Sequence, residues 1–295
     1  MKVIVNGASG YIGYHLVNSL LKNNHEVYAI CRSNTGHLKD MELFDNLHII
    51  ITEQSGVVEK LHKVVPDVWY QLAWEGACGE GRSNPELQIK NEMLSVNAMK
   101  IAKQIGCCKI IYAGTVYDNI LDAILEKEVF YKHSFYIISK KHAHEMTYQL
   151  SKKLCIDYVW CTFCHPVGKY MSEKQLLPYA VKCFLNNQPT EFGSCSQYFD
   201  VISVEDLSDA FVVLGENKCR KTEYYIGSGN PRILREYIEE AADICGYKLE
   251  VGFGKRHDDG LVFKREWFDT INLKTDFSFL SFTEFKNIIL EYIKM

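Results

Sequence analysis

A glycine-rich turn near the start of the chain constrains the fold more than any other feature. An apolar segment, residues 2–5, leads into Asn6-Gly7-Ala8-Ser9-Gly10-Tyr11-Ile12-Gly13, and an amphipathic stretch follows over residues 11–22. Glycines between a strand and a helix let the backbone turn sharply and approach a ligand closely, and the helix N-terminus offers N–H groups to an anion such as a pyrophosphate. This order predicts a dinucleotide site lined by Gly7, Ser9, Gly10, Tyr11, Ile12 and Gly13. A tight turn without a ligand is the alternative.

Short apolar segments alternate with longer stretches of helical period in the first half of the chain. The expected strands are residues 2–5, 26–31, 47–51, 67–73, 109–113 and 157–163, and the expected helices are residues 11–22, 57–64, 85–106 and 132–153. Strands that are apolar on both faces and alternate with helices predict an α/β fold with a doubly wound parallel sheet.

The second half is less regular. It has a loop and helix over residues 165–187, strands over 198–204 and 223–226, and a helix over 232–245. We expect residues 1–165 to form the dinucleotide-binding domain, with a strand near 198–206 rejoining its sheet. Residues 166–295 are expected to form mainly a smaller, mixed α/β substrate-binding part.

The composition excludes several classes of protein. The 295 residues include 47% hydrophobic and 24% charged residues, with a net charge of −4 and no stripe of Lys and Arg, so no nucleic-acid partner is expected. No apolar run approaches the roughly 18–20 residues of a membrane span. The eleven scattered cysteines and the lack of room for a signal peptide indicate free thiols in the cytoplasm.

One cysteine pattern is misleading. Residues 161–165 spell the haem-attachment motif Cys-x-x-Cys-His, but they lie in an apolar strand of a chain without an export signal. A zinc site would need a second Cys/His pair at suitable spacing. We predict no metal.

The residues after the second expected strand bear on the cofactor. NAD enzymes usually place Asp or Glu there to bond the ribose 2′-hydroxyl, but this chain reads Ile-Cys-Arg32-Ser33-Asn. Arg32 can fork onto a 2′-phosphate while Ser33 donates a hydrogen bond. The alternative is a solvated surface arginine. The pattern favours NADP(H), with NAD(H) possible.

Tyr136 and Lys140 are four residues apart in a helical stretch, so they share one helix face. A nearby ammonium favours the phenolate and lowers the pKa of a tyrosine from about 10, which would make Tyr136 a general acid/base. A core tyrosine beside a snorkelling lysine is the alternative.

The glycine turn, Tyr136-x-x-x-Lys140 and the Thr115 of Ala-Gly-Thr-Val-Tyr together resemble the extended short-chain dehydrogenase/reductase family, in its nucleotide-sugar epimerase, dehydratase and reductase branch. The similarity extends over nearly the whole chain, through Leu72-Ala73, residues 91–106, 165–168, 200–206 and 225–229.

This resemblance implies a Rossmann fold in which Tyr136 donates or accepts the proton and Lys140 tunes it while bonding the nicotinamide ribose. Thr115 would hold the reacting substrate oxygen, although the alignment there needs a short deletion that could put Ala113 at the site instead. Further cofactor contacts are expected from Leu72, Ala73, Asn91, His165 and Val167. Substrate contacts are expected from Trp74, Arg82, Thr115 and His165. Phe199 stands where UDP-sugar enzymes of the family often carry an arginine, so the nucleotide base stays undetermined.

We therefore expect NADPH-dependent reduction of a nucleotide-activated 4-keto, 6-deoxy sugar. A nucleotide-sugar 4-epimerase that retains NAD(P) and a non-catalytic NADP(H)-sensing protein are the alternatives. The helices expected over residues 85–106 and 132–153 resemble those that pair across the two-fold interface of the family, so we expect a homodimer.

Overall fold

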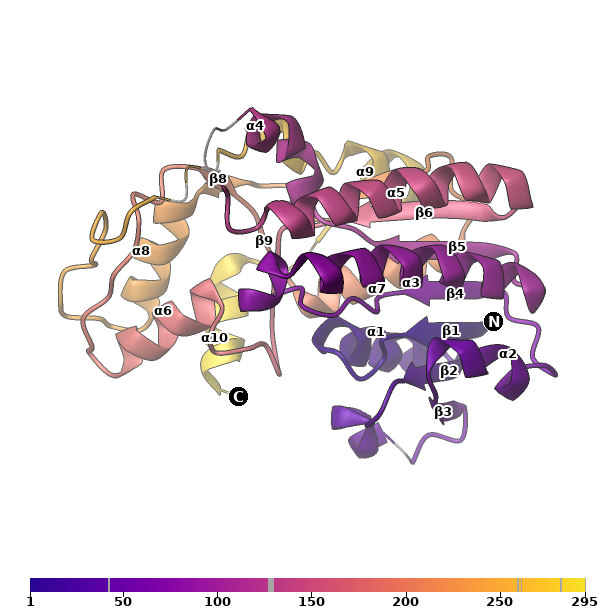
Figure 1. The fold of residues 1–295 in the computed structure, drawn as a ribbon. Helices are drawn as coiled ribbons and strands as arrows, with labels where there is room; N and C mark the ends of the chain where they lie inside the picture. The colour runs from indigo at the N-terminus through magenta and orange to yellow at the C-terminus, as the bar shows by residue number, and fades with distance from the viewer. Residues whose placement is uncertain (42, 127–129, 259, 261, 282, 295) are drawn as a thin grey trace. The chain divides into compact units, whose positions relative to one another are not determined.

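The computed structural model describes residues 1–41, 43–126, 130–258, 260, 262–281 and 283–294 (Figure 1). The chain forms two compact units. The first comprises residues 1–162 and 208–224, and the second comprises residues 163–207 and 225–295.

The first unit contains a seven-stranded sheet in the order β10-β6-β5-β4-β1-β2-β3. Each hydrogen-bonded pair among the first six strands is parallel. From β1 the chain first adds β2 and β3 on one side, and then adds β4, β5, β6 and β10 on the other side of β1. Ligands of doubly wound sheets bind at the carboxyl ends of the strands where this order reverses. The strands are β1 Lys2–Asn6, β2 Glu26–Cys31, β3 Leu47–Ile51, β4 Val68–Gln71, β5 Lys109–Ala113, β6 Asp157–Thr162 and β10 Glu223–Tyr225.

Helices cover both faces of this sheet (Figure 1). The helices α2, α3 and α5 share one apolar core with the sheet, in which Trp69, Met99, Tyr112, Ala143 and Trp160 are buried. The long helices α3 and α5 pack against each other. On the other face, Ser19 of α1 donates a hydrogen bond to Asp209 of α7. The helices are α1 Tyr11–Lys22, α2 Val57–Lys60, α3 Pro85–Gln104, α4 Leu121–Leu125, α5 Ser134–Leu154 and α7 Val204–Glu216, with 3₁₀ turns η1 Gly36–Met41, η2 Gln54–Gly56, η3 Gly79–Ser83 and η4 Val116–Ile120.

The ends of α3 and α5 follow from local sequence. Asn84 caps α3 by accepting a hydrogen bond from the Leu87 N–H at 2.9 Å, and Pro85 occupies the first turn. Cys155 ends α5 in the left-handed conformation, with φ of 50°.

The second unit is a smaller α/β assembly with two short sheets. In one sheet β7 pairs with β9 in parallel, and in the other β8 pairs with β11 in antiparallel fashion. The helices α6 and α10 both pack against α8. The elements are β7 His165–Val167, α6 Leu176–Leu185, β8 Tyr198–Phe199, β9 Val201–Ser203, β11 Arg232–Ile233, α8 Leu234–Ile244, η5 Arg265–Phe268, α9 Ile271–Phe277 and α10 Phe285–Lys294.

The expected return of a strand near residues 198–206 to the main sheet is wrong. This segment forms β8 and β9, which pair within the second unit, and residues 208–224 return to the first unit instead. The buried Asp200 between β8 and β9 explains the difference. Its carboxylate accepts hydrogen bonds from the Tyr225 hydroxyl at 2.8 Å and from the Ser228 N–H at 3.1 Å, so the segment is tied to the last residue of β10 and to the turn after it. The elements expected over residues 57–64 and 67–73 are also shorter than expected, at α2 and β4.

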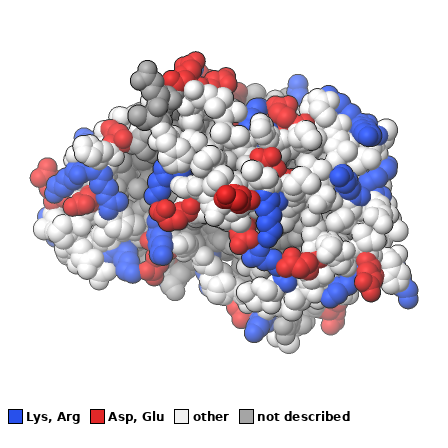
Figure 2. All heavy atoms as spheres, viewed as in Figure 1, with Lys and Arg blue, Asp and Glu red and all other residues white. Residues whose placement is uncertain are grey.

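Basic and acidic side chains are interspersed on the face shown in Figure 2. None of the helices among the described residues is long and apolar enough to cross a bilayer. All eleven cysteines are free thiols. Within the described part of the chain, no group of three or more His, Cys, Asp or Glu side chains could hold a metal ion.

Candidate active site

The glycine turn lies at the carboxyl ends of β1, β2 and β4. The Gly7 and Ala8 N–H groups donate hydrogen bonds to the Ile30 carbonyl at 3.2 and 3.3 Å. Gly7 has φ of +89°, and a Cβ there would lie 2.6 Å from the Ala73 nitrogen. A Cβ on Gly13 would lie 2.2 Å from the Gly7 carbonyl oxygen. The backbone is therefore packed too closely for side chains, and α1 begins directly after it, which is the arrangement that fits a pyrophosphate.

Arg32 follows β2 and forms an ion pair, with its Nη1 atom 2.5 Å from Oε2 of Glu75. Glu75 is held in turn by Asn91 of α3, whose side chain accepts from the Glu75 N–H at 2.9 Å and donates to the Glu75 carbonyl at 2.7 Å. The buried Asn91 side chain thus holds the loop after β4 in place through two hydrogen bonds. Ser33, also expected at the cofactor, is exposed beside Arg32.

Tyr136 lies in the first turns of α5 and is only 5% exposed. The Arg82 guanidinium lies over its ring, 4.6 Å from the ring centroid, and also 5.1 Å from the centroid of Tyr117. Burial raises the pKa of the Tyr136 phenol to about 12, although the Arg82 charge and a hydrogen bond with Thr115 act to lower it. The phenol is therefore protonated at neutral pH in this structure.

Lys140 lies one turn further along α5, but its ammonium contacts other groups. Its Nζ atom donates to the Ala113 carbonyl at 2.8 Å and lies 3.8 Å from the centroid of the Trp74 ring. Burial lowers the pKa of Lys140. In this structure the cation that lowers the pKa of Tyr136 most is Arg82, and burial outweighs it. The role of Lys140 in acidifying Tyr136 stays a prediction.

Thr115 caps the 3₁₀ turn η4, and its Oγ1 atom accepts a hydrogen bond from the Tyr117 N–H at 3.3 Å. Its hydrogen bond with Tyr136 brings it to the phenol. Ala113 contributes its carbonyl to Lys140 instead. Of the two residues that the sequence allowed at this position, Thr115 is the one whose side chain bonds the phenol.

Sequence reasoning did not assign two buried residues at this centre. Asp118 of η4 is 8% exposed, and its Oδ2 atom accepts a hydrogen bond at 3.0 Å from Nε1 of Trp160, which lies on β6. The only signal in the sequence was that Asp118 comes three residues after Thr115.

The remaining expected residues have other surroundings. Leu72 and Ala73 lie against Gly7. Trp74 donates from Nε1 to the Gln88 side chain at 2.9 Å. His165 and Val167 lie on β7 in the second unit, where the His165 ring packs 5.3 Å from that of Phe199.

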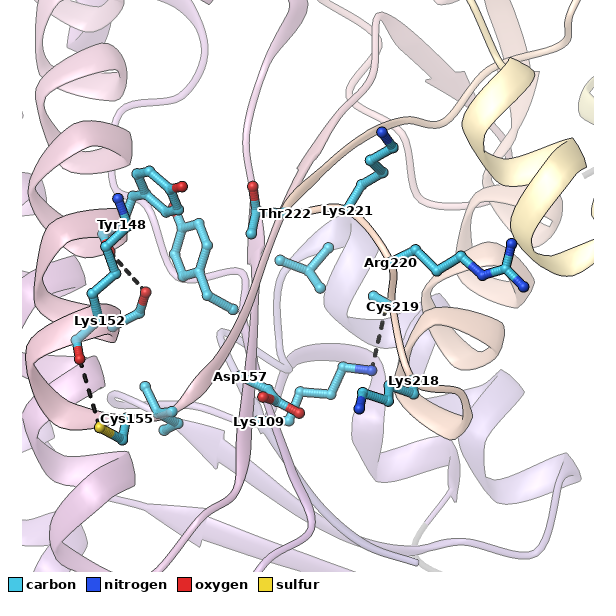
Figure 3. Close-up of a pocket in the computed structure, with 14 residues that line it drawn as sticks. Lys109, Tyr148, Lys152, Cys155, Asp157, Lys218, Cys219, Arg220, Lys221 and Thr222 are labelled. Carbon is cyan, nitrogen blue, oxygen red and sulfur yellow. Dashed lines mark hydrogen bonds between the residues drawn. The ribbon is translucent and has the colours of Figure 1, made fainter.

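A cavity of about 470 Å³ also opens in the first unit, at the opposite ends of the strands (Figure 3). It is lined by the start of β5 and β6, the end of α5 and the loop over residues 218–222. Its cations point in different directions (Figure 3). Lys109 donates to the Asn217 carbonyl at 2.6 Å. This cavity lies at the amino ends of the strands, away from the glycine turn and Tyr136.

The parallel sheet, the glycine turn and the centre around Tyr136 define a dinucleotide-dependent oxidoreductase or epimerase with a Rossmann fold. The chain belongs to the NAD dependent epimerase/dehydratase family, whose model matches residues 3–227. It is an NAD(P)-dependent enzyme of the extended short-chain dehydrogenase/reductase type that modifies nucleotide sugars.

Curated relatives and solved structures agree with this assignment. CDP-abequose synthase of Salmonella typhimurium is 26% identical over 250 residues, which cover 80% of this chain and 78% of that protein. The dTDP-4-dehydro-6-deoxyglucose reductase of Escherichia coli is 23% identical over 265 residues, covering 85% and 84% of the two chains. The crystal structure of dTDP-glucose 4,6-dehydratase from Bacillus anthracis, in complex with NAD, has the same fold, with a TM-score of 0.79, 18% identity, and coverage of 100% of this chain and 96% of that one.

Proposed function

We propose that the protein is an NADPH-dependent reductase of a nucleotide-activated 4-keto sugar, specifically a 6-deoxy sugar. The observation that carries the proposal is the buried Tyr136 phenol, which both Thr115 and the Arg82 guanidinium contact. Reduction of a ketone needs an acid at the substrate oxygen, whereas epimerisation begins by oxidising an alcohol and needs a base. Burial raises the pKa of the Tyr136 phenol to about 12, which supports its role as the acid in the reductive direction.

Reduction adds a hydride to the keto carbon and a proton to its oxygen. The nicotinamide cofactor, when bound at the glycine turn, supplies the hydride. Tyr136 gives its phenolic proton to the oxygen, which Thr115 holds. Arg82 and Thr115 then stabilise the phenolate that remains, because both contact the Tyr136 side chain. Solvent returns a proton to Tyr136 after the product leaves.

The names of the relatives support this direction. One curated relative is a dTDP-4-dehydro-6-deoxyglucose reductase. A nucleotide-sugar 4-epimerase with retained cofactor is the second candidate, because the matching family model is named for epimerases as well as dehydratases.

Incubation of the purified protein with NADPH and a panel of 4-keto nucleotide sugars tests the proposal. We expect stoichiometric oxidation of NADPH, and we expect Tyr136→Phe, which keeps the ring but removes the proton, to lower kcat by about 10²–10⁴-fold. Isomerisation without net NADPH oxidation would identify an epimerase. Binding of NADPH with no conversion of any sugar, together with an unaltered cellular phenotype of Tyr136→Phe, would identify a cofactor-sensing protein.

Arg32 supports NADP(H) as the preferred cofactor, since its guanidinium follows β2, where a carboxylate would select NAD. We expect Arg32→Asp to reverse the preference measured as the ratio of kcat/KM for NADPH and NADH. An unchanged ratio would refute the assignment.

A further inference from the structure

Asp118 is a buried acid at the catalytic centre that the proposed mechanism does not use. It lies in η4, the 3₁₀ turn that Thr115 caps. One carboxylate oxygen accepts the hydrogen bond from Trp160, and the other, Oδ1, is buried and has no hydrogen-bond partner among the described residues. A buried carboxylate with an unsatisfied oxygen is costly unless a charge nearby compensates it.

Lys140 carries the opposite charge and is also buried. Its ammonium is buried, donates to a neutral carbonyl at 2.8 Å, and otherwise faces the rings of Trp74 and Trp160, with Nζ at 3.8 and 5.9 Å from their centroids. Carbonyls and aromatic faces stabilise a cation, but they do not neutralise it. The same indole that Lys140 faces donates to Asp118, so Trp160 is the common neighbour of the two charges.

The surroundings of Trp160 fix this arrangement. The indole stacks with the rings of His144 and Tyr112, whose centroids lie 4.6 and 5.6 Å from that of the indole. A Cβ on Gly114 would lie 2.2 Å from the indole Nε1 atom, so only glycine at this position lets the indole reach Asp118. The carboxylate is thus held in place by a rigid group rather than by a mobile side chain.

We propose that Asp118 is a positioning residue that supplies the counter-charge for Lys140 and keeps its ammonium protonated in the dry catalytic centre. The pairing of the two charges rests on the burial of both groups and on their common neighbour Trp160. Its effect on turnover rests on the proposed reductase function, in which a charged Lys140 binds the nicotinamide ribose.

The direction of the pKa shifts agrees with this pairing. Burial raises the pKa of Asp118, and Lys140 opposes that rise; burial lowers the pKa of Lys140, and Asp118 opposes that fall. The other charges that act on the pair are Lys141 and Glu223 on Asp118, and Arg82 on Lys140. His144 is neutral at physiological pH, since burial lowers its pKa to about 4, so its stacking on Trp160 adds no charge.

The test measures the titration of Lys140 directly, without substrate. In protein labelled with ¹³C at the lysine ε-carbon, the Lys140 signal is identified by its loss in Lys140→Arg. We expect Asp118→Asn to lower the titration midpoint of Lys140 by about one pH unit or more, a tenfold loss of proton affinity. Asp122→Asn, which removes an exposed carboxylate from α4, is the matched control and should leave the midpoint unchanged.

A Lys140 midpoint in Asp118→Asn equal to that in Asp122→Asn would overturn the proposal, whether or not the protein reduces 4-keto sugars. Since coupling between two sites is reciprocal, the pair can also be tested from the other side if Asp118→Asn does not fold. Lys140→Gln should raise the titration midpoint of the Asp118 carboxyl carbon, and an unchanged midpoint would again overturn it. If the protein reduces a 4-keto sugar, the kcat/KM of Asp118→Asn should also begin to fall at a lower pH than that of the wild type. We expect kcat/KM to be about tenfold below the wild-type value at pH 8 and little changed at pH 6.

Discussion

Two cations bear on Tyr136: Lys140, which shares its helix, and Arg82 of η3. They contact different groups in the structure. Lys140 shares its helix face, as the spacing of four predicts, but the Lys140 ammonium turns to the Ala113 carbonyl and the Trp74 ring. Arg82 comes from η3, far from Tyr136 in sequence, and lies over the phenol. Helix periodicity indicates which residues share a face, whereas the loops that approach that face are decided by the tertiary fold. Arg82 was therefore expected to contact the sugar or diphosphate of the substrate, whereas in the structure it lies over the Tyr136 ring.

Glu75 provides a residue-scale prediction about the cofactor. Its carboxylate pairs with Arg32 and places a negative charge where a 2′-phosphate would bind. Glu75→Gln removes that charge and releases Arg32, so we expect the KM for NADPH to fall by about two- to fivefold, the effect of one exposed charge pair. The KM for NADH should change less. Glu59→Gln, an exposed acid on α2, serves as the control, and equal effects of the two variants would exclude a role for Glu75.

At the scale of elements, the glycine turn and η4 contribute in different ways. The turn was predictable because close backbone contacts require Gly7 and Gly13, and the order strand, turn, helix is visible in the sequence. The 3₁₀ turn η4 was not expected, because it has no hydrophobic period of its own. It forms where β5 ends and Thr115 caps the next turn, and it brings Thr115 and Asp118 to the same centre.

Gly7→Ala tests the backbone requirement of the turn. An alanine there meets both a positive φ and the Ala73 backbone, whereas Gly246 has φ of +66° with nothing within 4 Å of an added Cβ. We expect Gly246→Ala to lower the free energy of unfolding by about 1–2 kcal/mol through backbone strain alone. Gly7→Ala should cost about 1–3 kcal/mol more and weaken NADPH binding at least tenfold. Urea unfolding and calorimetric titration measure both effects, and equal stability losses would contradict the predicted clash.

At the scale of the whole molecule, the exposed sides of α3 and α5 carry apolar side chains. Ile89 and Met93, one turn apart on α3, are 58% and 53% exposed, and Met146 on α5 is 60% exposed. Since the two helices pack side by side, we propose that this surface is the interface of a homodimer. Scattered apolar residues are ordinary on a monomer, so the proposal rests on their position on paired long helices.

Sedimentation velocity tests the dimer. We expect the wild type to sediment at about twice its chain mass of 34.0 kDa, and Met93→Glu to sediment as a monomer because a carboxylate would be buried at the interface. Leu249→Glu places the same charge on an apolar residue of the second unit that is 47% exposed and should remain dimeric. A monomeric wild type would end this proposal.

The sequence by itself determined the alternation of strands and helices, the glycine turn and the pair Tyr136 and Lys140, because these depend on short-range patterns that burial imposes on neighbouring residues. The tertiary structure decided which segments return to the sheet and which groups surround the phenol. The segment near residues 198–206 has the pattern of a strand, but the buried Asp200 ties it to Tyr225 and Ser228 in the second unit. Likewise, the placement of Arg82 over Tyr136 and of Trp160 against Asp118 joins residues distant in sequence. Such contacts depend on how the packed elements meet, and local sequence patterns do not record them.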